Sequence, residues 1–448
     1  TWVWEDADRA KDLSDLYNSL RNRTIPRTFN GDFIDPPGLA MMYRPDSNGR
    51  GGLHPHQKRA IWRQVQMGTT YLHHAVGAGK TLEMIIGGME QKRLGLISKP
   101  MYTVPNHVLG QFASEFLEAY PTANIMVADE DTFTGDRRRQ FIAQATVNNP
   151  DAIIISHSAM RLLRVKPETM SAVVDDMIAD LKAAIDDVED NDRIGRKKLE
   201  QQLEALQQKI EVKLDNRKQD DVVFFEDIGV DFLYVDEAHD FRKLDFVTNR
   251  TNVKGIKPQG SAKALDLFAK TNYLARQRPG RSHVFASGTA VTNTMGELFT
   301  VEKFMDYDGL RKAGLHHFDA WASEYGQVVT EYERNAAGQY KPVERFARFD
   351  NIPELMKRVL DRMDVLTSAQ LGDLVKRPDI EGGKPKMVVA EPSDELMQYM
   401  QGFLADRIKA SMEWKPSGDQ PYNPDPMLAS ISDARLAVID MRFVDPTS

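Results

Sequence analysis

The stretch HHAVGAGKTLEM, residues 73–84, decides the fold of this chain. It follows a short apolar segment and leads into a segment of helical character. Glycines in such a loop let backbone amides approach phosphate oxygens, and the N-terminus of the following helix adds its dipole. Lys80 is suited to reach the β- and γ-phosphates of a nucleotide, and the Thr81 hydroxyl is suited to bind Mg²⁺. The predicted nucleotide contacts in this loop are Gly77, Ala78, Gly79, Lys80 and Thr81.

The loop departs from the strict pattern G-x-x-x-x-G-K-[ST], because His74 stands where the first glycine belongs. The form A-x-x-G-x-G-K-T is present instead, beginning at Ala75. A GKT triplet alone is also compatible with an ordinary surface loop. Its place between an apolar segment and a helix favours a site for ATP with Mg²⁺.

A second motif, FLYVDEAHD (232–240), places an acidic pair at the end of an apolar run. An aspartate at such a strand end holds the Mg²⁺ that neutralises phosphates, which is the predicted role of Asp236. Glu237 is placed to orient and deprotonate the attacking water. His239 is expected to tie this loop to a neighbouring strand rather than to do chemistry. The alternative is a helix cap with a solvated acidic tail, but the GKT motif in the same chain favours catalysis.

Two further motifs support the nucleotide site. In LHPHQKRAI (53–61), Gln57 carries both a donor and an acceptor for the edge of adenine, although Pro55 could also mark an ordinary helix start. The stretch FASGTAVTNT (285–294) places small hydroxyl residues at a strand end, where they can hydrogen-bond the histidine of the acidic motif. The residues predicted to couple the two motifs are His239, Ser287, Gly288 and Thr289.

The pattern of apolar runs predicts the fold class. Short buried strands are expected at 101–105, 152–156, 232–236 and 283–287, separated by amphipathic stretches. Such alternation is typical of an α/β domain with a mainly parallel central sheet. We expect a lead-in segment at 1–50, with a helix near Ala7 to Leu20, and a nucleotide-binding lobe at 51–308. A helical extension at 309–379 and the start of a further lobe at 380–448 follow, the latter opening with a strand and a helix.

One insert, 167–221, lacks any strand signal. Apolar residues recur there at helical spacing in two groups, which predicts an antiparallel helical hairpin. We expect a self-packed, solvated insert; the alternative is an arm that touches DNA or a partner. The two seams consist of Met170, Val174, Met177, Leu181, Ala184 and Val188, and of Leu199, Leu203, Leu206 and Ile210.

Composition excludes several classes of protein. The chain has no cysteine, which removes disulfides, thiolate zinc sites and cysteine nucleophiles and fits a reducing compartment. No apolar run is long enough to span a membrane, and residues 1–12 lack the basic and apolar regions of a secretory signal. Because the net charge is −8, any contact with DNA must come from a local cluster. The chain starts with Thr1 rather than Met, so we expect it to be a piece of a larger protein.

Residues that follow other strands are candidates for DNA contact. VPNH (104–107) and SHS (156–158) stand at two predicted strand ends, where ligands gather in open α/β sheets. Small polar groups there can hold phosphates without reading bases. The run 137–139 is the densest basic cluster, although it also fits a solvated helix face. The candidates are Pro105, Asn106, His157, Ser158, Arg137, Arg138 and Arg139.

Taken together, these motifs resemble superfamily-two DNA translocases of the Swi/Snf-like type. More specifically, the chain resembles the helicase part of the very large methyltransferase–helicase proteins of phages and mobile elements, the antirestriction-like group. Segments without a general helicase meaning carry this resemblance: TIPRTFNGDFIDPPG (24–38), HHFDAWASEYG (316–326) and DARLAVIDMRFVDP (433–446). It implies a RecA-like fold and ATP-driven movement on double-stranded DNA. It also implies an adenine methyltransferase domain in the parent protein.

The chain departs from the family pattern at its second lobe. A Q-x-x-G-R-x-x-R helix there supplies arginine fingers to ATP, and nothing between Gly309 and Ser448 matches it. We therefore expect this chain to bind ATP but to hydrolyse it slowly. Two alternatives remain open: the motor part of a restriction or anti-phage enzyme, and a nucleotide-gated binding module without motor activity. The resemblance implies the cytoplasm of a bacterial host, or carriage in a phage particle.

Overall fold

The computed structural model describes residues 27–45, 52–186, 224–250, 253–256, 258–292, 294–334, 340–372, 389–415, 423 and 425–445, with residues 13, 197, 200, 201 and 204. The chain divides into two compact units, Thr1–Val375 and Lys376–Ser448, which are treated separately below. The lead-in helix expected near Ala7 to Leu20 lies outside the described residues apart from Leu13.

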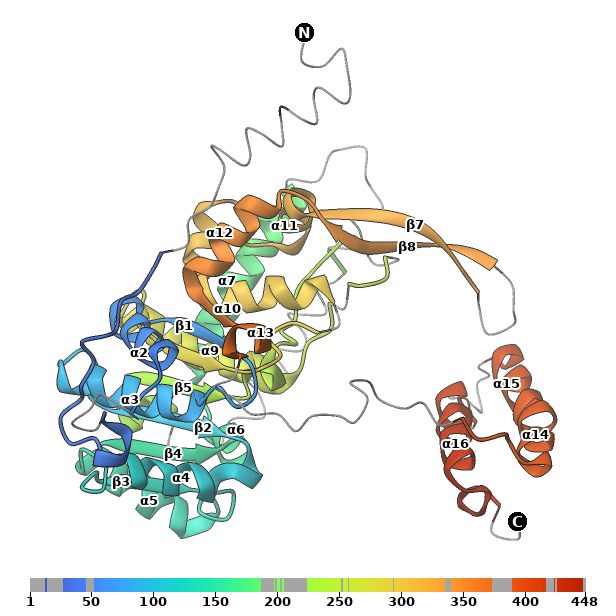
Figure 1. The fold of residues 1–448 in the computed structure, drawn as a ribbon. Helices are drawn as coiled ribbons and strands as arrows, with labels where there is room; N and C mark the ends of the chain where they lie inside the picture. Colours follow the sequence, from blue (N-terminus) through green and yellow to red (C-terminus); the bar gives the residue numbers. More distant parts are fainter. Residues whose placement is uncertain are drawn as a thin grey trace. The chain divides into compact units, whose positions relative to one another are not determined.

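The first unit is built on a seven-stranded sheet in which every pair of neighbouring strands is parallel (Figure 1). Its strand order is β3-β4-β2-β5-β6-β1-β9. The four runs expected to be strands correspond to β2, β4, β5 and β6, so the α/β class with a parallel central sheet is confirmed. The strands are β1 (Thr70–His74), β2 (Pro100–Val104), β3 (Ile125–Ala128), β4 (Ala152–Ser156), β5 (Phe232–Asp236), β6 (His283–Ala286) and β9 (Met363–Leu366).

Helices cover both faces of this sheet, because successive strand residues point to opposite sides. On one face, Tyr102 and Tyr234 pack with apolar residues of α2, α3 and α4. On the other, Met101 and Leu233 pack with residues of α5, α6, α7, α9 and α10. The helices are α2 (Pro55–Met67), α3 (Lys80–Arg93), α4 (Leu109–Ala119), α5 (Gly135–Val147), α6 (His157–Leu162), α7 (Pro167–Asp186), α9 (Ala262–Gln277) and α10 (Met295–Lys312), with short turns η2 (Met41–Tyr43), η3 (Asn106–Val108), η4 (Phe225–Ile228) and η5 (Ala238–Phe241).

The first helix of the expected hairpin, α7, packs on the lobe instead of standing apart from it. Met170, Val174, Met177 and Leu181 are buried as predicted, but the first three belong to the main core cluster. Val173 is buried there as well, so the apolar stripe is broad, as in a core-facing helix. The expectation of a solvated insert is therefore wrong for α7. The second seam lies outside the described residues.

The range 309–379 contains strands as well as the helices expected there. After α11 (Phe318–Tyr325), an antiparallel ribbon of β7 (Gly326–Arg334) and β8 (Tyr340–Phe349) extends away from the helices, as Figure 1 shows. Next come α12 (Ile352–Arg362), the sheet strand β9 and α13 (Ser368–Leu371). Charged residues are frequent in β7 and β8, so their sequences did not indicate a ribbon.

The second unit contains α14 (Asp394–Gln401), α15 (Phe403–Glu413), α16 (Met427–Ile439) and the turn η7 (Met441–Phe443). The Arg407 guanidinium fastens α15 to the segment around α16, with 2.7 Å to Asp425 and 2.8 Å to Asp433. The helix expected after the strand is α14, whereas 384–388 of that strand lie outside the described residues. No helix in the part of the chain that the structure describes is long and apolar enough to cross a membrane.

Candidate functional site: a nucleotide-binding edge of the sheet

The phosphate loop joins the end of β1 to the start of α3. Gly77 and Gly79 have φ angles of 88° and 87°, a left-handed conformation that glycine adopts without strain. A Cβ atom on Gly79 would lie 2.2 Å from Nε2 of Gln57, so that side chain would have to shift, and the φ of 87° by itself already favours glycine here. Lys80 begins α3, and its Nζ donates to the carbonyl oxygen of His74 at 3.1 Å. The ammonium group is therefore held over the loop.

The other residues predicted around the loop lie against its backbone. The Ala78 carbonyl accepts from Gln57 Nε2 at 3.4 Å and lies 2.9 Å from Nε2 of His56. The Gln57 Oε1 atom accepts from the backbone N–H of His54 at 2.9 Å. The amide of Gln57 thus supports the loop in this structure, and adenine recognition stays a prediction. Thr81 follows Lys80 in the first turn of α3 and is half-buried.

His74, which replaces the first glycine of the strict pattern, lies in a buried carboxylate cluster. Its Nδ1 is 2.8 Å from Glu83 of α3, and its Nε2 is 3.3 Å from Asp364 of β9. Burial alone would lower the pKa of His74, but the two carboxylates outweigh it and raise this pKa to about 9. A charged imidazolium therefore connects the phosphate-loop helix to the edge strand.

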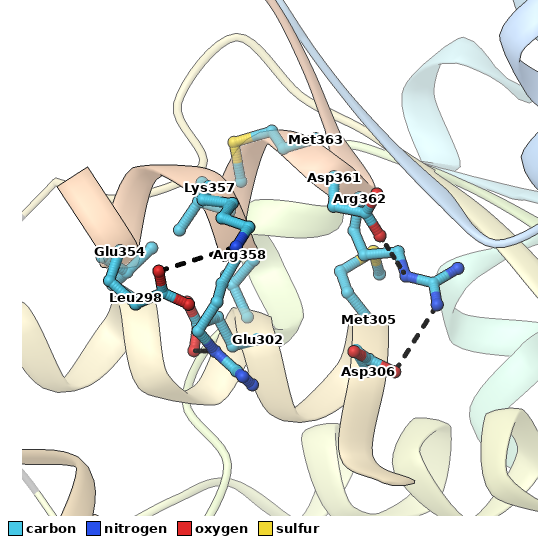
Figure 2. Close-up of a pocket in the computed structure, with 12 residues that line it drawn as sticks. Leu298, Glu302, Met305, Asp306, Glu354, Lys357, Arg358, Asp361, Arg362 and Met363 are labelled. Atoms are coloured by element: carbon cyan, nitrogen blue, oxygen red, sulfur yellow. Dashed lines mark ion pairs between the residues drawn. The ribbon is translucent and has the colours of Figure 1, made fainter. Parts of the chain in front are cut away.

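Contacts with α2 fix the position of strand β9, and contacts with α10 fix the helix α12 that precedes it. Arg63 of α2 lies 3.7 Å from Asp364 and donates to the carbonyl of Leu360 at 2.6 Å. Figure 2 shows α12, which precedes β9, paired with α10 through Arg362 and Asp306 at 3.6 Å and through Arg358 and Glu302 at 4.0 Å.

A cavity of about 290 Å³ lies between α10 and α12, lined by apolar as well as charged residues (Figure 2). Neither Lys80 nor Asp236 is among its lining residues. The phosphate loop therefore lies outside this cavity, at the edge of the sheet.

The His74 cluster predicts how stability depends on pH. The pKa of His74 is about 9 in the folded protein and about 6.5 in an unfolded chain. A raised histidine pKa contributes stability that is complete below pH 6.5 and is lost as the pH rises through the folded value. We expect the free energy of unfolding to fall by about 2 kcal/mol between pH 6.5 and 8. Urea unfolding across this range measures the loss.

The matched variant for this measurement is His74→Gln, which keeps a polar side chain without a titrating charge. The difference between the two proteins isolates His74 from other groups that titrate nearby in pH, such as Glu302 with its pKa of about 7. Parallel pH profiles for the two proteins would show that His74 does not carry this charge.

The acidic pair lies at the end of β5, where Asp236 is followed by a sharp turn. Glu237 has φ 46° and ψ 47°, a left-handed conformation that costs a non-glycine residue about 1 kcal/mol or more. Its backbone N–H donates to Oδ1 of Asp236 at 3.0 Å. Burial and the neighbouring Glu237 raise the pKa of Asp236 to about 6, while Lys80 opposes this shift. A half-buried carboxylate beside a second one favours a cation at this position.

The structure brings the coupling residues together with Glu237. The Oγ atom of Ser287, just after β6, lies 3.0 Å from Nδ1 of His239 and donates to Oε2 of Glu237 at 3.3 Å. The same Glu237 oxygen is 2.9 Å from Nδ1 of His239. The backbone N–H of Thr289 donates to Ser287 Oγ at 3.1 Å, whereas the Thr289 side chain is exposed. Gly288 lies beside Val76 of the phosphate loop.

The candidates for DNA contact separate into three groups. Asn106, in the turn after β2, donates to Ser158 Oγ at 2.6 Å and accepts from the Ser158 backbone at 3.2 Å, so the two loops meet at the same edge. Pro105 precedes this turn. The His157 ring points inward to the acidic loop instead. The basic run begins α5, where Arg137 and Arg139 are exposed and Arg138 is half-buried.

Sequence reasoning missed three residues of this edge: His56, Glu83 and Asp364. His56 stands beside Gln57 in a motif that had been noticed, so its place could have been anticipated. Glu83 lies one helical turn after Lys80, but buried polar residues in helices are usually structural. Nothing near Asp364 in the sequence indicates that its strand would pair with β1.

The residues present fit Mg²⁺ bound together with a nucleotide. No group of three or more histidine or acidic side chains in the described residues could hold a metal ion by itself. Mg²⁺ at phosphate sites is held by one or two protein oxygens, with phosphates and water completing the shell. The Thr81 hydroxyl and the Asp236 carboxylate are oxygens of this kind.

Comparison with known proteins identifies the family. Residues 62–366 match a family model described as "Probable helicase domain". The chain is 21% identical over 422 residues to defense against restriction protein B of Escherichia phage P1, and the match covers 85% of this chain but 18% of that protein.

Solved structures of lower similarity were also found. The SWI2/SNF2 ATPase core of Sulfolobus solfataricus in complex with double-stranded DNA is 13% identical, with a TM-score of 0.38, over 90% of this chain and 60% of that one. The same core domain solved separately is 13% identical, with a TM-score of 0.39, over 93% and 62% of the two chains. The family match alone spans most of this chain, as the phosphate loop and acidic pair led us to expect: the chain belongs to the helicase-domain family.

Proposed function

We propose that this chain is the ATP-binding lobe of a DNA-dependent ATPase of the helicase or translocase kind. One observation carries the proposal: the phosphate loop and the acidic pair occupy the same edge of the sheet, because β1 and β5 are separated only by β6. Lys80 is near enough to Asp236 for its charge to lower the pKa of that carboxyl. Strand ends of a parallel sheet are where such ligands bind.

Each residue has a role that its chemistry supports. Lys80 and the loop amides bind the phosphates, and Thr81 and Asp236 would hold Mg²⁺, which supplies charge neutralisation. Glu237 accepts a proton from the attacking water. Ser287 contacts both Glu237 and His239 and directly follows β6. A movement of Glu237 on nucleotide binding would therefore be transmitted through Ser287 to β6.

Duplex DNA is the proposed partner, bound at the Asn106–Ser158 contact with help from the basic run at 137–139. Both loops present small polar groups and backbone amides, which suit phosphate contacts without sequence reading. The net charge of −8 restricts this interaction to a local surface. The resemblance of the motifs to double-stranded DNA translocases makes duplex DNA the probe to test first.

The role in the parent protein is proposed from the phage relative. The name of that protein describes defence against restriction, and this chain spans about a fifth of its length. We infer a larger phage or mobile-element protein with a second RecA-like lobe and an adenine methyltransferase domain, acting in the bacterial cytoplasm. A restriction nuclease domain in the parent would instead support a restriction enzyme.

Lys80→Ala tests the proposed site directly. Without the ammonium group the β- and γ-phosphates lose their charged partner, so ATP·Mg²⁺ binding should weaken by at least about tenfold. Titration with a fluorescent ATP analogue measures the affinity. The matched control is Lys312→Ala, an exposed lysine at the end of α10.

Hydrolysis should be measured with duplex DNA, single-stranded DNA, RNA or no nucleic acid. Stimulation by duplex DNA of a rate that stays slow is the expected result for this chain alone. Equal ATP affinity in the Lys80 and Lys312 variants would contradict the assignment of Lys80 to the phosphate-binding site. ATP binding without any response to nucleic acid would support a nucleotide-gated module instead of a motor.

A further inference from the structure

His157 makes a contact that DNA binding does not explain. It follows β4, which is separated from β5 by β2, yet its ring reaches across the end of β2 to the acidic loop. Its Nε2 lies 3.0 Å from the carbonyl oxygen of Asp236. A carbonyl oxygen only accepts hydrogen bonds, so Nε2 carries the proton and donates.

The surroundings of the His157 ring fix its position. The ring meets Phe241 of η5 edge-on, with 5.0 Å between centroids, and Nδ1 is 3.7 Å from a carboxylate oxygen of Asp240. The side chain is 12% exposed, too buried to offer its ring to a ligand on the surface. Burial lowers the pKa of His157, which keeps the ring neutral near pH 7 even though Asp240 opposes this shift. Lys263, on the other side of Asp240, adds to the lowering.

The carbonyl that accepts from His157 belongs to the peptide between Asp236 and Glu237. The N–H at the other end of this peptide donates to Oδ1 of Asp236 at 3.0 Å. Both polar ends of the peptide are therefore held, immediately before the residue with φ 46°. A left-handed glutamate persists only where its surroundings hold it, and the peptide plane sets the direction of the Glu237 side chain.

The neighbour of His157 connects this contact to the proposed DNA surface. Ser158 exchanges two hydrogen bonds with Asn106, at 2.6 Å and 3.2 Å, and Asn106 is exposed. A phosphate bound to Asn106 or Ser158 would act on the start of α6, one residue from the ring that holds the acidic pair.

We propose that His157 is a positioning residue for the Asp236–Glu237 pair, holding the peptide between the two carboxylates in place and linking it to the Asn106–Ser158 contact. This inference rests on the proposed function, in which the Glu237 carboxylate activates water. His157 would keep that carboxylate in the required position. His157 touches neither nucleotide nor water; it acts through the backbone of Asp236.

Two substitutions separate the donated hydrogen bond from the packing of the ring. His157→Phe keeps a ring against Phe241 but removes the donor. His157→Gln keeps an N–H donor at a similar reach. Thermal unfolding of both variants first establishes that they fold, and binding of a fluorescent ATP analogue should change less than about twofold, because the phosphate loop is untouched.

The first readout is hydrogen–deuterium exchange of the amides at 237–241, which needs neither ATP nor hydrolysis. Exchange in the Phe variant should be about five- to tenfold faster, the change that matches loss of one hydrogen bond. The Gln variant should exchange like the unmodified chain. Equal exchange in all three proteins, or equal acceleration in both variants, would overturn the proposal.

The second readout is single-turnover ATP hydrolysis with Mg²⁺, with and without a DNA duplex. The Phe variant should hydrolyse about 10- to 100-fold more slowly, the effect of a misplaced catalytic group, and should lose stimulation by the duplex. Wild-type hydrolysis by the Phe variant would also overturn the proposal. If the unmodified chain neither binds nor hydrolyses ATP, the proposed function fails, and the exchange measurement still decides the role of His157.

Discussion

Glu237→Gln should leave ATP bound and reduce its hydrolysis by about 10²- to 10⁴-fold, the usual contribution of a general base. The amide of glutamine has the same shape, and its oxygen can still accept from Ser287, so the coupling contact is kept. What it lacks is a basic oxygen that takes a proton from water. Single-turnover hydrolysis measures the chemical step, and a fluorescent ATP analogue measures binding.

A second glutamate that lies on the surface provides a control for the Glu237 variant. Glu118→Gln, at an exposed position of α4, is the matched control and should behave as the unmodified chain. Loss of ATP binding together with hydrolysis in the Glu237 variant would assign Glu237 to binding or folding. Hydrolysis by this variant at the rate of the unmodified chain would show that Glu237 is not the general base.

Local features of the sequence were enough to predict the central part of the fold. The strands β2, β4 and β5 are buried along most of their length, and their continuous apolar runs require a covering layer on each face. The phosphate loop was recognisable because glycine at 77 and 79 is needed for backbone conformation, which a short motif records. The acidic pair was recognisable for a similar reason, since Asp236 directly ends an apolar run.

Contacts between segments far apart in the chain could not be predicted from the sequence. Asp364 completes the cluster around His74, yet β9 has only four residues and lies beyond the range 51–308 expected to form the lobe. A strand of four residues carries no information on which strand it pairs with. His74 was noticed only as a departure from a motif, because its two carboxylate partners come from α3 and β9.

Packing of helices against the lobe was mispredicted for a related reason. The spacing of Met170, Val174 and Met177 indicates one apolar seam but not its partner, and a nearby seam of similar width suggested a hairpin. Burial of Val173 as well gives α7 a broad stripe that fits the core. Ionic contacts confirm this placement, since Asp180 pairs with Arg311 of α10 at 3.0 Å.

Completion of the site by a second lobe should have the largest effect on turnover. Among the described residues, no arginine forms an ion pair with Asp236 or Glu237, and Lys80 is the positive charge held over the phosphate loop. Phosphoryl transfer spreads negative charge over the γ-phosphate, and an arginine finger accelerates it by about 10³-fold or more. We therefore expect the chain alone to hydrolyse ATP slowly, and a longer chain that includes the proposed second RecA-like lobe to be about 10³-fold faster with duplex DNA present.

Replacing the expected arginines of that lobe by alanine in the longer chain should return the rate to that of the short chain while ATP affinity stays nearly the same. Replacing them by lysine should recover little activity, because an ammonium lacks the planar fork of donors that a guanidinium presents to phosphate oxygens. Fast, DNA-stimulated turnover by the short chain would contradict this expectation, since the lobe would then carry all the charge that the reaction requires. Burial, with the charge of Glu237 added to it, already raises the pKa of Asp236 to about 6 before any phosphate is bound. A triphosphate adds further negative charge to this edge, which bound Mg²⁺ and the arginines of the proposed second lobe would offset.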